Sequence, residues 1–258
     1  MKSKMMWQAM AIALLCTGAA RAADPPKGNI LRDYTDSVAP AEQQAYEAGI
    51  KRYNQCLKQH GFKYTWTAWL HQTGDTYMYS YVTDPITWAS FDDMREASKA
   101  CDATIYSDVN PHLKSEWSGF MQAMPELSYM PADANTKGGL IEVTTFKLKP
   151  GHTAYEAFMD AAKKITAAAA KTHWSSHYSM GQVREGGEDA PDFVLVGRYN
   201  SWAELGKDDN PPLWTMVENA YGKEAAQGIR KSLNEAIAHI ESHVDSYDAE
   251  LTYDGSGK

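Results

Sequence analysis

An ordered internal repeat limits the folds that this chain can adopt. Short segments within residues 30–113 recur, in the same order, within residues 140–213. The matching pairs are AYEA at 45–48 and 154–157, WASF at 88–91 and WAEL at 202–205, and NPHL at 110–113 and NPPL at 210–213. Solenoid repeats have shorter periods, of roughly 20–50 residues. The repeat therefore predicts two domain-sized units, residues 30–131 and residues 140–253, joined by a polar linker.

The first 22 residues match a secretory signal peptide. Lys2 and Lys4 provide positive charge, and residues 5–16 form an apolar segment that is too short to span a bilayer. Small residues at Ala20 and Ala22 precede the expected cleavage site. We therefore expect a mature chain that begins at Ala23 and is periplasmic or secreted, rather than an uncleaved membrane anchor.

The charge of the mature chain excludes two classes of partner. Cleavage after residue 22 removes three of the 25 basic residues and none of the 33 acidic residues, so the net charge changes from −8 to −11. A chain this acidic is repelled by nucleic acid and by anionic lipid. We expect no nucleic-acid partner, and no membrane association after signal cleavage because no second apolar stretch is long enough.

Two cysteines remain after cleavage. Cys16 leaves with the signal, and Cys56 and Cys101 stay in the first unit. An even pair in an oxidising compartment favours a disulfide. The alternative is a pair of buried thiols, which behave as small apolar side chains. We predict a Cys56–Cys101 disulfide because both residues lie in helices expected to cover the same face of one sheet.

Hydrophobic periodicity predicts the same element order in both units. In the second unit we expect strands over 140–148, 174–183, 193–199 and 246–253, and helices over 152–171, 201–205, 211–220 and 224–244. In the first unit we expect strands over 30–38, 62–71, 77–83 and 127–130, and helices over 41–59 and 88–124. A strand–helix–strand–strand–helix–strand order is the ferredoxin-like arrangement.

Several local motifs resemble a known superfamily. A strand that ends in KPG at 149–151, a helix that contains YEAF at 155–158, and an aromatic strand that runs into SWAEL at 201–205 resemble the dimeric α-β barrel proteins. The most similar domains are of the NIPSNAP and antibiotic-biosynthesis-monooxygenase types. The resemblance implies an α+β fold in which two tandem ferredoxin-like units form a pseudo-dimeric α-β barrel around a cavity.

Strand alternation selects candidate cavity residues. Side chains on a strand point alternately to its two faces. Trp69 and His71 share the more polar face of the 62–71 strand, and His173 and His177 share that of the 174–183 strand. Both faces are expected to line the space between the sheets or, alternatively, to contact solvent.

A row of tyrosines on the 77–83 strand adds two further candidates. Tyr77, Tyr79 and Tyr81 alternate along this strand. Tyrosine offers apolar area with a hydroxyl group, which suits an aromatic ligand. Packing against neighbouring strands is the alternative. The predicted ligand-binding set is Trp69, His71, Tyr79, Tyr81, His173 and His177.

The sequence predicts no metal site and no cofactor. His239 and His243 are four residues apart on the predicted last helix, and His173 and His177 have the same spacing on a strand. A metal site requires three or four convergent ligands, and neither pair has a third. Glycine-rich phosphate loops and nucleophile elbows are absent from the sequence.

Three functions are compatible with these features. The leading hypothesis is a binding protein for a small hydrophobic or aromatic molecule. The rival, which the superfamily resemblance allows, is a cofactor-free oxygenase or isomerase. In that case His71 or His177 acts as general base, and Tyr79 or Arg198 holds an oxyanion. The third is a structural or stress-responsive protein without a ligand.

Overall fold

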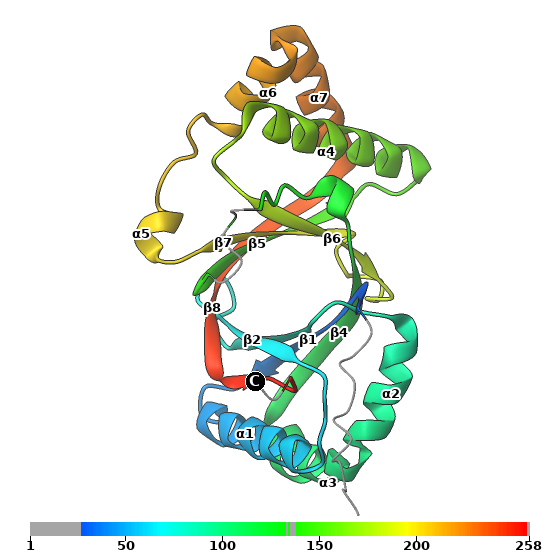
Figure 1. The fold of residues 1–258 in the computed structure, drawn as a ribbon, viewed down its shortest axis with the longest axis vertical. Coiled ribbons are helices and arrows are strands. Elements are labelled where there is room, and N and C mark those ends of the chain that lie inside the picture. Colours follow the sequence, from blue (N-terminus) through cyan, green and yellow to red (C-terminus); the bar gives the residue numbers. More distant parts are fainter. Residues whose placement is uncertain (1–26, 133, 135–137, 257–258) are drawn as a thin grey trace, which may run out of the picture.

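The computed structural model describes residues 27–132, 134 and 138–256. Its eight strands form one antiparallel sheet that closes on itself in the order β1-β3-β2-β8-β5-β7-β6-β4 (Figure 1). The predicted signal peptide and its cleavage site lie outside the described residues. None of the helices over the described ranges has the length and apolar character that a bilayer crossing requires.

The chain combines helices with one antiparallel sheet, which confirms the predicted α+β class. The strands are β1 Lys27–Val38, β2 Trp66–His71, β3 Met78–Thr83, β4 Leu113–Ala123, β5 Leu140–Leu148, β6 Tyr178–Arg184, β7 Phe193–Tyr199 and β8 Ile237–Tyr253. The helices are α1 Gln43–Gln59, α2 Trp88–Ser98, α3 Asp102–Thr104, α4 His152–Thr172, α5 Trp202–Leu205, α6 Leu213–Tyr221 and α7 Lys223–Ala236.

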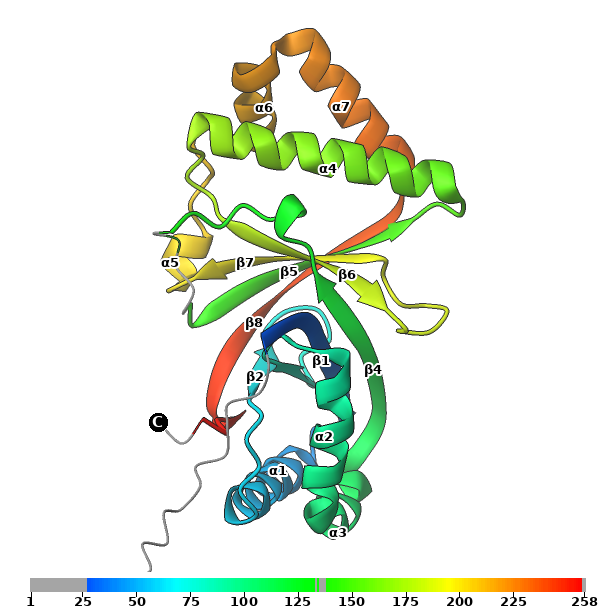
Figure 2. The ribbon, with the colours of Figure 1, turned by 45° about the vertical axis from the view of Figure 1, so that its right-hand side comes forward.

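The helices lie outside the barrel, in two groups. Helices α1, α2 and α3 cover the half formed by β1 to β4, and helices α4, α6 and α7 cover the half formed by β5 to β8 (Figures 1 and 2). The two halves join where β2 pairs with β8 and where β4 pairs with β6. These six helices therefore pack on the convex face of the sheet, and the concave face encloses the interior.

The helix-facing cores follow from apolar stripes at helical spacing. On α4, Phe158, Ala162 and Ile165 are buried against the sheet and neighbouring helices. Phe158 also stacks on Phe193 of β7, with ring centroids 4.5 Å apart. Burial of a side chain of this size contributes about 1.5–3 kcal/mol. Alanines on the same stripe favour the helix and allow close packing of α6 and α7.

Three predicted elements are wrong. The helix predicted over 88–124 is interrupted after Ser98, and its residues 113–123 form the last strand of the first half. The strand predicted over 127–130 is absent: a 3-10 turn occupies Pro125–Leu127, and Tyr129 forms an isolated bridge to Tyr178. The last helix ends at Ala236, and residues 237–244 belong to β8. Apolar residues of β8 happen to recur at helical spacing, but pairing with β5 on one side determines the strand.

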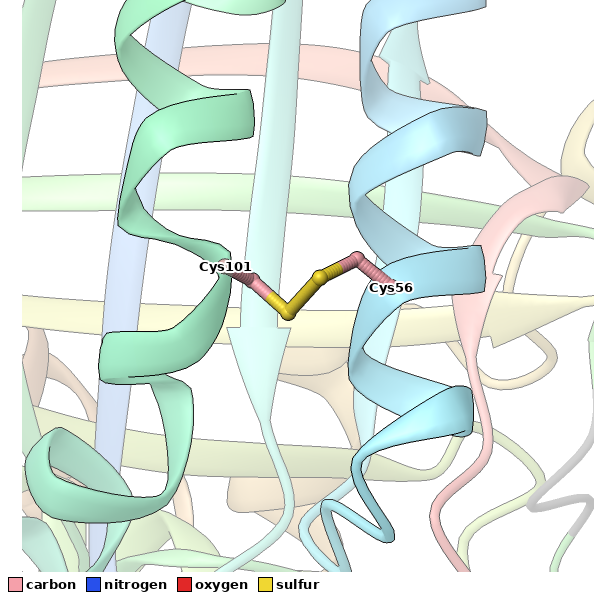
Figure 3. Close-up of a disulfide and its surroundings, with 2 residues drawn as sticks. All are labelled: Cys56 and Cys101. Carbon is pink, nitrogen blue, oxygen red and sulfur yellow. A yellow bond between two sulfur atoms is a disulfide. The ribbon is translucent and has the colours of Figure 1, made fainter.

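The predicted disulfide is present. Cys56 of α1 and Cys101, in the 3-10 turn that follows α2, are bonded with their Cα atoms 5.9 Å apart (Figure 3). Cys101 is fully buried, among Leu57, Phe62 and Tyr64. The bond joins the two helical segments that cover the first half of the sheet.

Candidate functional site

The concave face of the sheet encloses a cavity of about 1120 Å³. Residues from all eight strands line it, because alternate side chains on each strand point inward. Much of the wall is apolar. Its apolar residues include Leu31, Val82, Met121, Ile141, Val143, Val194 and Val196. The volume of the cavity is slightly above the range of about 300–1,000 Å³ that is usual for small-molecule sites, and its mainly apolar lining is typical of them.

One region of the wall is polar, and we refer to it as the polar pole. It consists of Asp33, Thr35, His71, Ser80, His243 and Asp245. These residues come from β1, β3, β2 and β8, which are consecutive neighbours in the sheet. Strand register places His71 directly opposite Asp245, and Thr35 directly opposite Ser80. Residues from both ends of the chain therefore meet at one patch.

Short polar contacts connect the polar pole. His71 Nε2 lies 3.1 Å from Ser80 Oγ, which lies 2.9 Å from Thr35 Oγ1. The carboxylate of Asp245 approaches both imidazoles: Oδ1 is 3.8 Å from His71 Nε2, and Oδ2 is 3.4 Å from His243 Nε2. The two rings stack with centroids 4.4 Å apart. The imidazoles and the carboxylate thus form one compact group.

Burial sets the electrostatics of the polar pole. Desolvation, and then the charge of Asp245, raises the pKa of Asp33 to about 7, against the opposing effects of the Thr35 hydrogen bond and of His243. Desolvation also lowers the pKa of His71, although Asp245 acts in the opposite direction. His71 is therefore mainly neutral at neutral pH, and Asp33 retains a proton to higher pH than an ordinary aspartate does.

Two carboxylate oxygens of the polar pole have no hydrogen-bond partner among the described residues. They are Oδ1 of Asp33 and Oδ1 of Asp245. Asp245 is only 2 % exposed. Over the same described ranges, no lysine or arginine forms an ion pair with either carboxylate. The two imidazoles are therefore the basic groups that contact these buried acidic groups within the described ranges, and burial of a carboxylate without a strong positive partner is unfavourable.

A single arginine contributes positive charge elsewhere on the cavity wall. Arg198 of β7 lies over the ring of Trp69, with Cζ 5.9 Å from the ring centroid. Burial lowers the pKa of the guanidinium, but arginine stays charged at neutral pH. Within the described part of the chain the guanidinium makes no hydrogen bond or ion pair, although the backbone of Arg198 pairs with β5. The guanidinium is free to bind an anionic group inside the cavity.

The structure brings together three of the candidates that the sequence singled out. Trp69, His71 and Arg198 all line the cavity. On β2 the alternate residues Ala68 and Leu70 contact the helix-side core instead. The predicted alternation therefore holds for this strand. Trp69 and His71 face the cavity rather than solvent.

The two histidines of the second half do not reach the cavity. His173 is exposed and ends α4 in a left-handed conformation. The ring of His177 packs edge-on against Tyr129, with centroids 5.6 Å apart, and does not line the cavity. The predicted alternation fails here because β6 begins at Tyr178 and not at Trp174, so residues 173–177 do not lie on a strand. The expectation that His71 and His177 share an internal space is wrong for His177.

The two tyrosines of β3 point to the other face of the sheet. Tyr79 and Tyr81 belong to the core beneath α1, and Tyr79 packs on Tyr46 with ring centroids 4.9 Å apart. The Tyr79 hydroxyl donates a hydrogen bond to Glu47. Their assignment to the barrel ligand site is therefore wrong. The inward residues of β3 are Met78, Ser80 and Val82, so the two tyrosines pack in the helix-side core instead.

Asp33, His243 and Asp245 were missed as site residues. His243 falls at the end of the segment 224–244, whose apolar spacing predicted a helix, and Asp245 follows it directly. His243, Asp245 and Tyr247 alternate on β8, and this two-residue period was the available signal. On β1 the same two-residue period places Leu31, Asp33 and Thr35 on the cavity side.

A smaller cavity of about 450 Å³ lies on the helix side of the first half. Asp36 lines it and is 4 % exposed. The Tyr46 hydroxyl donates to Asp36 Oδ2 over 2.6 Å and lies 2.9 Å from the Tyr81 hydroxyl. Burial raises the pKa of Asp36 to about 7, despite the opposing Tyr46 hydrogen bond.

Solved structures with the same architecture extend the comparison to known proteins. A "putative monooxygenase" from Lactobacillus acidophilus aligns with a TM-score of 0.53 at 9% identity, over 88% of this chain and 96% of that one. An anthrone oxidase-like protein gives 0.53 at 10% identity, over 89% and 93%. A mutant chlorite dismutase from Candidatus Nitrospira defluvii gives 0.52 at 11% identity, over 87% and 92%.

These similarities establish the fold and no more. The structures are dimeric α-β barrel proteins, and this chain has the same α+β architecture with an eight-stranded antiparallel sheet. No family model and no curated protein matches the sequence.

Proposed function

We propose that this protein binds a small, mainly apolar molecule that carries one anionic group, inside the barrel. The observation that carries this proposal is the unequal lining of the cavity of about 1120 Å³: it is apolar over most of its wall, and the Arg198 guanidinium, which lies over Trp69, forms no hydrogen bond or ion pair with a described residue. Apolar walls with a few convergent polar groups are typical of small-molecule sites. An aromatic carboxylate or phenolate fits both features.

The arrangement around Trp69 supports an aromatic ligand. Arg198 lies over one part of the indole, and Tyr247 of β8 packs edge-on against it with ring centroids 5.8 Å apart. His71, the start of the polar pole, is two residues along the same strand, which is about 7 Å. A ligand held by Arg198 would therefore contact the polar pole with its other end.

Binding of an aromatic anion tests the proposal. We expect the mature, untagged chain to bind 2-naphthoate more tightly than the neutral 2-naphthamide in isothermal titration calorimetry. Arg198→Met should weaken 2-naphthoate binding about 10–100-fold, because a hydrogen bond to a charged group contributes about 1.5–3 kcal/mol. Binding of 2-naphthamide should change little.

Arg230→Met is the matched control. Arg230 also lies over a tryptophan, 5.3 Å from the ring of Trp214, but in the helical layer outside the barrel. The Arg230→Met variant should bind 2-naphthoate with the affinity of the wild type. Equal affinities in Arg198→Met and the wild type would remove Arg198 from the site. Failure of both probes to bind would favour the structural role without a ligand.

A second candidate function is catalysis of the oxygenase or isomerase type. It is supported by the polar pole, which places reactive groups beside the apolar chamber, and by neighbours named as a monooxygenase and as an anthrone oxidase-like protein. Oxygen uptake with anthrone in aerated buffer tests it. A rate equal to that of heat-denatured protein would contradict this candidate and leave the binding proposal intact.

The architecture is part of the same proposal: two tandem ferredoxin-like units form a pseudo-dimeric barrel. Support comes from the sheet order, which is β4-β1-β3-β2 in the first half and β8-β5-β7-β6 in the second. In each half, the fourth strand (β4 or β8) lies beside the first (β1 or β5). The third strand (β3 or β7) lies between the first and the second (β2 or β6). Two of the three recurring segments fall at corresponding places: AYEA lies in α1 and in α4, and WASF and WAEL begin α2 and α5. The third does not, because NPHL leads into β4 and NPPL leads into α6.

The protein is proposed to act outside the cytoplasm, after removal of residues 1–22. The Cys56–Cys101 disulfide supports this compartment, because such bonds persist under oxidising conditions. N-terminal sequencing of protein recovered from the periplasm or medium is expected to begin at Ala23. A sequence that begins at Met1 would contradict the proposal.

A further inference from the structure

We propose that His71, His243 and Asp245 bind one divalent transition-metal ion of the zinc type at the polar pole. This metal site goes beyond the proposed function and does not rest on it. Each of the three residues offers one ligand atom, and these atoms all lie within 4.8 Å of one another. Two come from β8 and one from β2, so paired strands hold the set in place.

The distances fit coordination of a single ion. Zinc binds imidazole nitrogen and carboxylate oxygen at about 2.0–2.2 Å, so two ligand atoms on one ion are roughly 3.0–3.5 Å apart. Asp245 Oδ2 is 3.4 Å from His243 Nε2, and Asp245 Oδ1 is 3.8 Å from His71 Nε2. The ligand atoms of the two histidines lie within 4.8 Å of each other, so binding of one ion requires side-chain rotations that bring the two imidazole nitrogens closer together.

The charge of the polar pole calls for a cation. Asp245 is 2 % exposed, and its Oδ1 has no hydrogen-bond partner among the described residues. Asp33, whose Oδ1 is likewise unpartnered, acts electrostatically on both Asp245 and His243. A divalent ion would compensate the buried Asp245 carboxylate and would favour the ionised form of Asp33 beside it.

The donor set indicates which metals fit. Two imidazoles and one carboxylate suit zinc and neighbouring first-row ions, whereas calcium and magnesium require oxygen ligands. Three protein ligands leave a position open, as in catalytic rather than structural zinc sites. Here the ligand set lines the apolar chamber, so the open position would be available to a bound molecule.

The hydrogen bonds of the polar pole can adapt to the ion. His71 Nε2 would exchange its contact with Ser80 Oγ, 3.1 Å away, for the metal. Ser80 would keep its hydrogen bond to Thr35. The other cluster of possible ligands in the described part of the chain, Cys56, His60 and Cys101, is unsuitable because both cysteines form the disulfide.

Cobalt titration tests the site directly. Co²⁺ is the probe because its visible absorption reports coordination by imidazole and carboxylate. We expect the chelator-treated, untagged mature chain to bind one Co²⁺, and Zn²⁺ to displace it. His243→Ala and Asp245→Asn should each weaken Co²⁺ binding by at least about 100-fold, since even loss of an outer-shell partner costs 10–100-fold.

His239→Ala is the matched control. His239 lies on β8 with the same two-residue phase as His243, but its side chain is 71 % exposed against 19 % for His243. This variant should bind Co²⁺ as the wild type does. Circular dichroism without metal checks that each variant folds. If Asp245→Asn does not fold, His243→Ala tests the site, because His243 is the less buried of the two residues.

Two results would overturn the metal site. One is the absence of a Co²⁺ spectrum in the wild type. The other is equal Co²⁺ affinity in His243→Ala and the wild type, which would place the ion on exposed histidines. Neither result affects 2-naphthoate binding, and a failure of 2-naphthoate to bind leaves Co²⁺ binding unaffected, so the two proposals fail separately.

Discussion

Removal of the Cys56–Cys101 disulfide is expected to lower the free energy of unfolding by about 4 kcal/mol. The bond closes a loop with a sequence separation of 45 residues. In the chain-entropy account, a cross-link of this span restricts the unfolded chain and thereby destabilises it relative to the folded state. A loss of this size is a large part of the ordinary net stability of about 5–15 kcal/mol. Urea denaturation of Cys56→Ala/Cys101→Ala against the wild type measures it.

Reduction of the wild type provides the matched control. The reduced protein keeps both sulfur atoms in place, so its loss of stability isolates the cross-link from the packing of the fully buried Cys101. The double-alanine variant adds the cost of a small cavity. Two free thiols per chain in denatured, unreduced mature protein would contradict the disulfide. A loss below about 1 kcal/mol on reduction would contradict the entropic argument.

Asp36→Asn is expected to remove a large part of the pH dependence of stability. Burial raises the pKa of Asp36 from 3.8 to about 7, with a smaller contribution from Glu116, while the Tyr46 hydrogen bond opposes it. The folded state therefore holds the proton more tightly than the unfolded chain, and stability falls as the pH rises from about 4 to 7. At about 1.4 kcal/mol per pKa unit, the fall is about 4 kcal/mol.

The asparagine variant keeps the local geometry but cannot ionise. Its amide oxygen can accept the hydrogen bond that Tyr46 donates to Asp36 in the wild type. Urea unfolding at pH 4.5 and at pH 8 gives the free energy of unfolding of both proteins. Relative to the wild type, the stability of Asp36→Asn should rise by several kcal/mol from pH 4.5 to pH 8. Other groups, Asp33 included, titrate equally in both proteins and cancel in the comparison.

An exposed carboxyl serves as the control for this experiment. Asp92 lies on α2 and is exposed, so Asp92→Asn should follow the wild type at both pH values. If Asp36→Asn also followed the wild type, Asp36 would be ionised in the folded protein at low pH. Water would then have to reach Oδ1, for which the described structure provides no partner.

Local patterns in the sequence were sufficient for much of the fold. The stripes on α1 and α4 and the run of β-branched residues in β5 predicted these elements to within a few residues. On β2, the two-residue period predicted that Trp69 and His71 point away from the helices, and both line the cavity. Such patterns succeed because each side of an isolated element already differs in polarity.

The errors lie where a local pattern was ambiguous or short. The first part of β8 has apolar residues at helical spacing and was predicted as a helix. The strand predicted over 174–183 starts four residues too early, because β6 begins at Tyr178. In both cases the partner strands decide the conformation: β8 pairs with β5 and β2 along its length, whereas residues 173–177 have no ladder to join. Pairing of this kind outweighs the modest local preferences of single residues.

The sequence by itself determined the element order, the helix-facing stripes, the inward face of β2 and the cysteine pair that bonds. Only the tertiary structure decided that Asp33, His71, His243 and Asp245 meet. These residues lie on three different strands, and their proximity depends on the order in which β1, β3, β2 and β8 pair. A strand carries its own alternation in its sequence, but its neighbours across the sheet are set by long-range pairing and by closure of the barrel, because no local energy term distinguishes one partner strand from another.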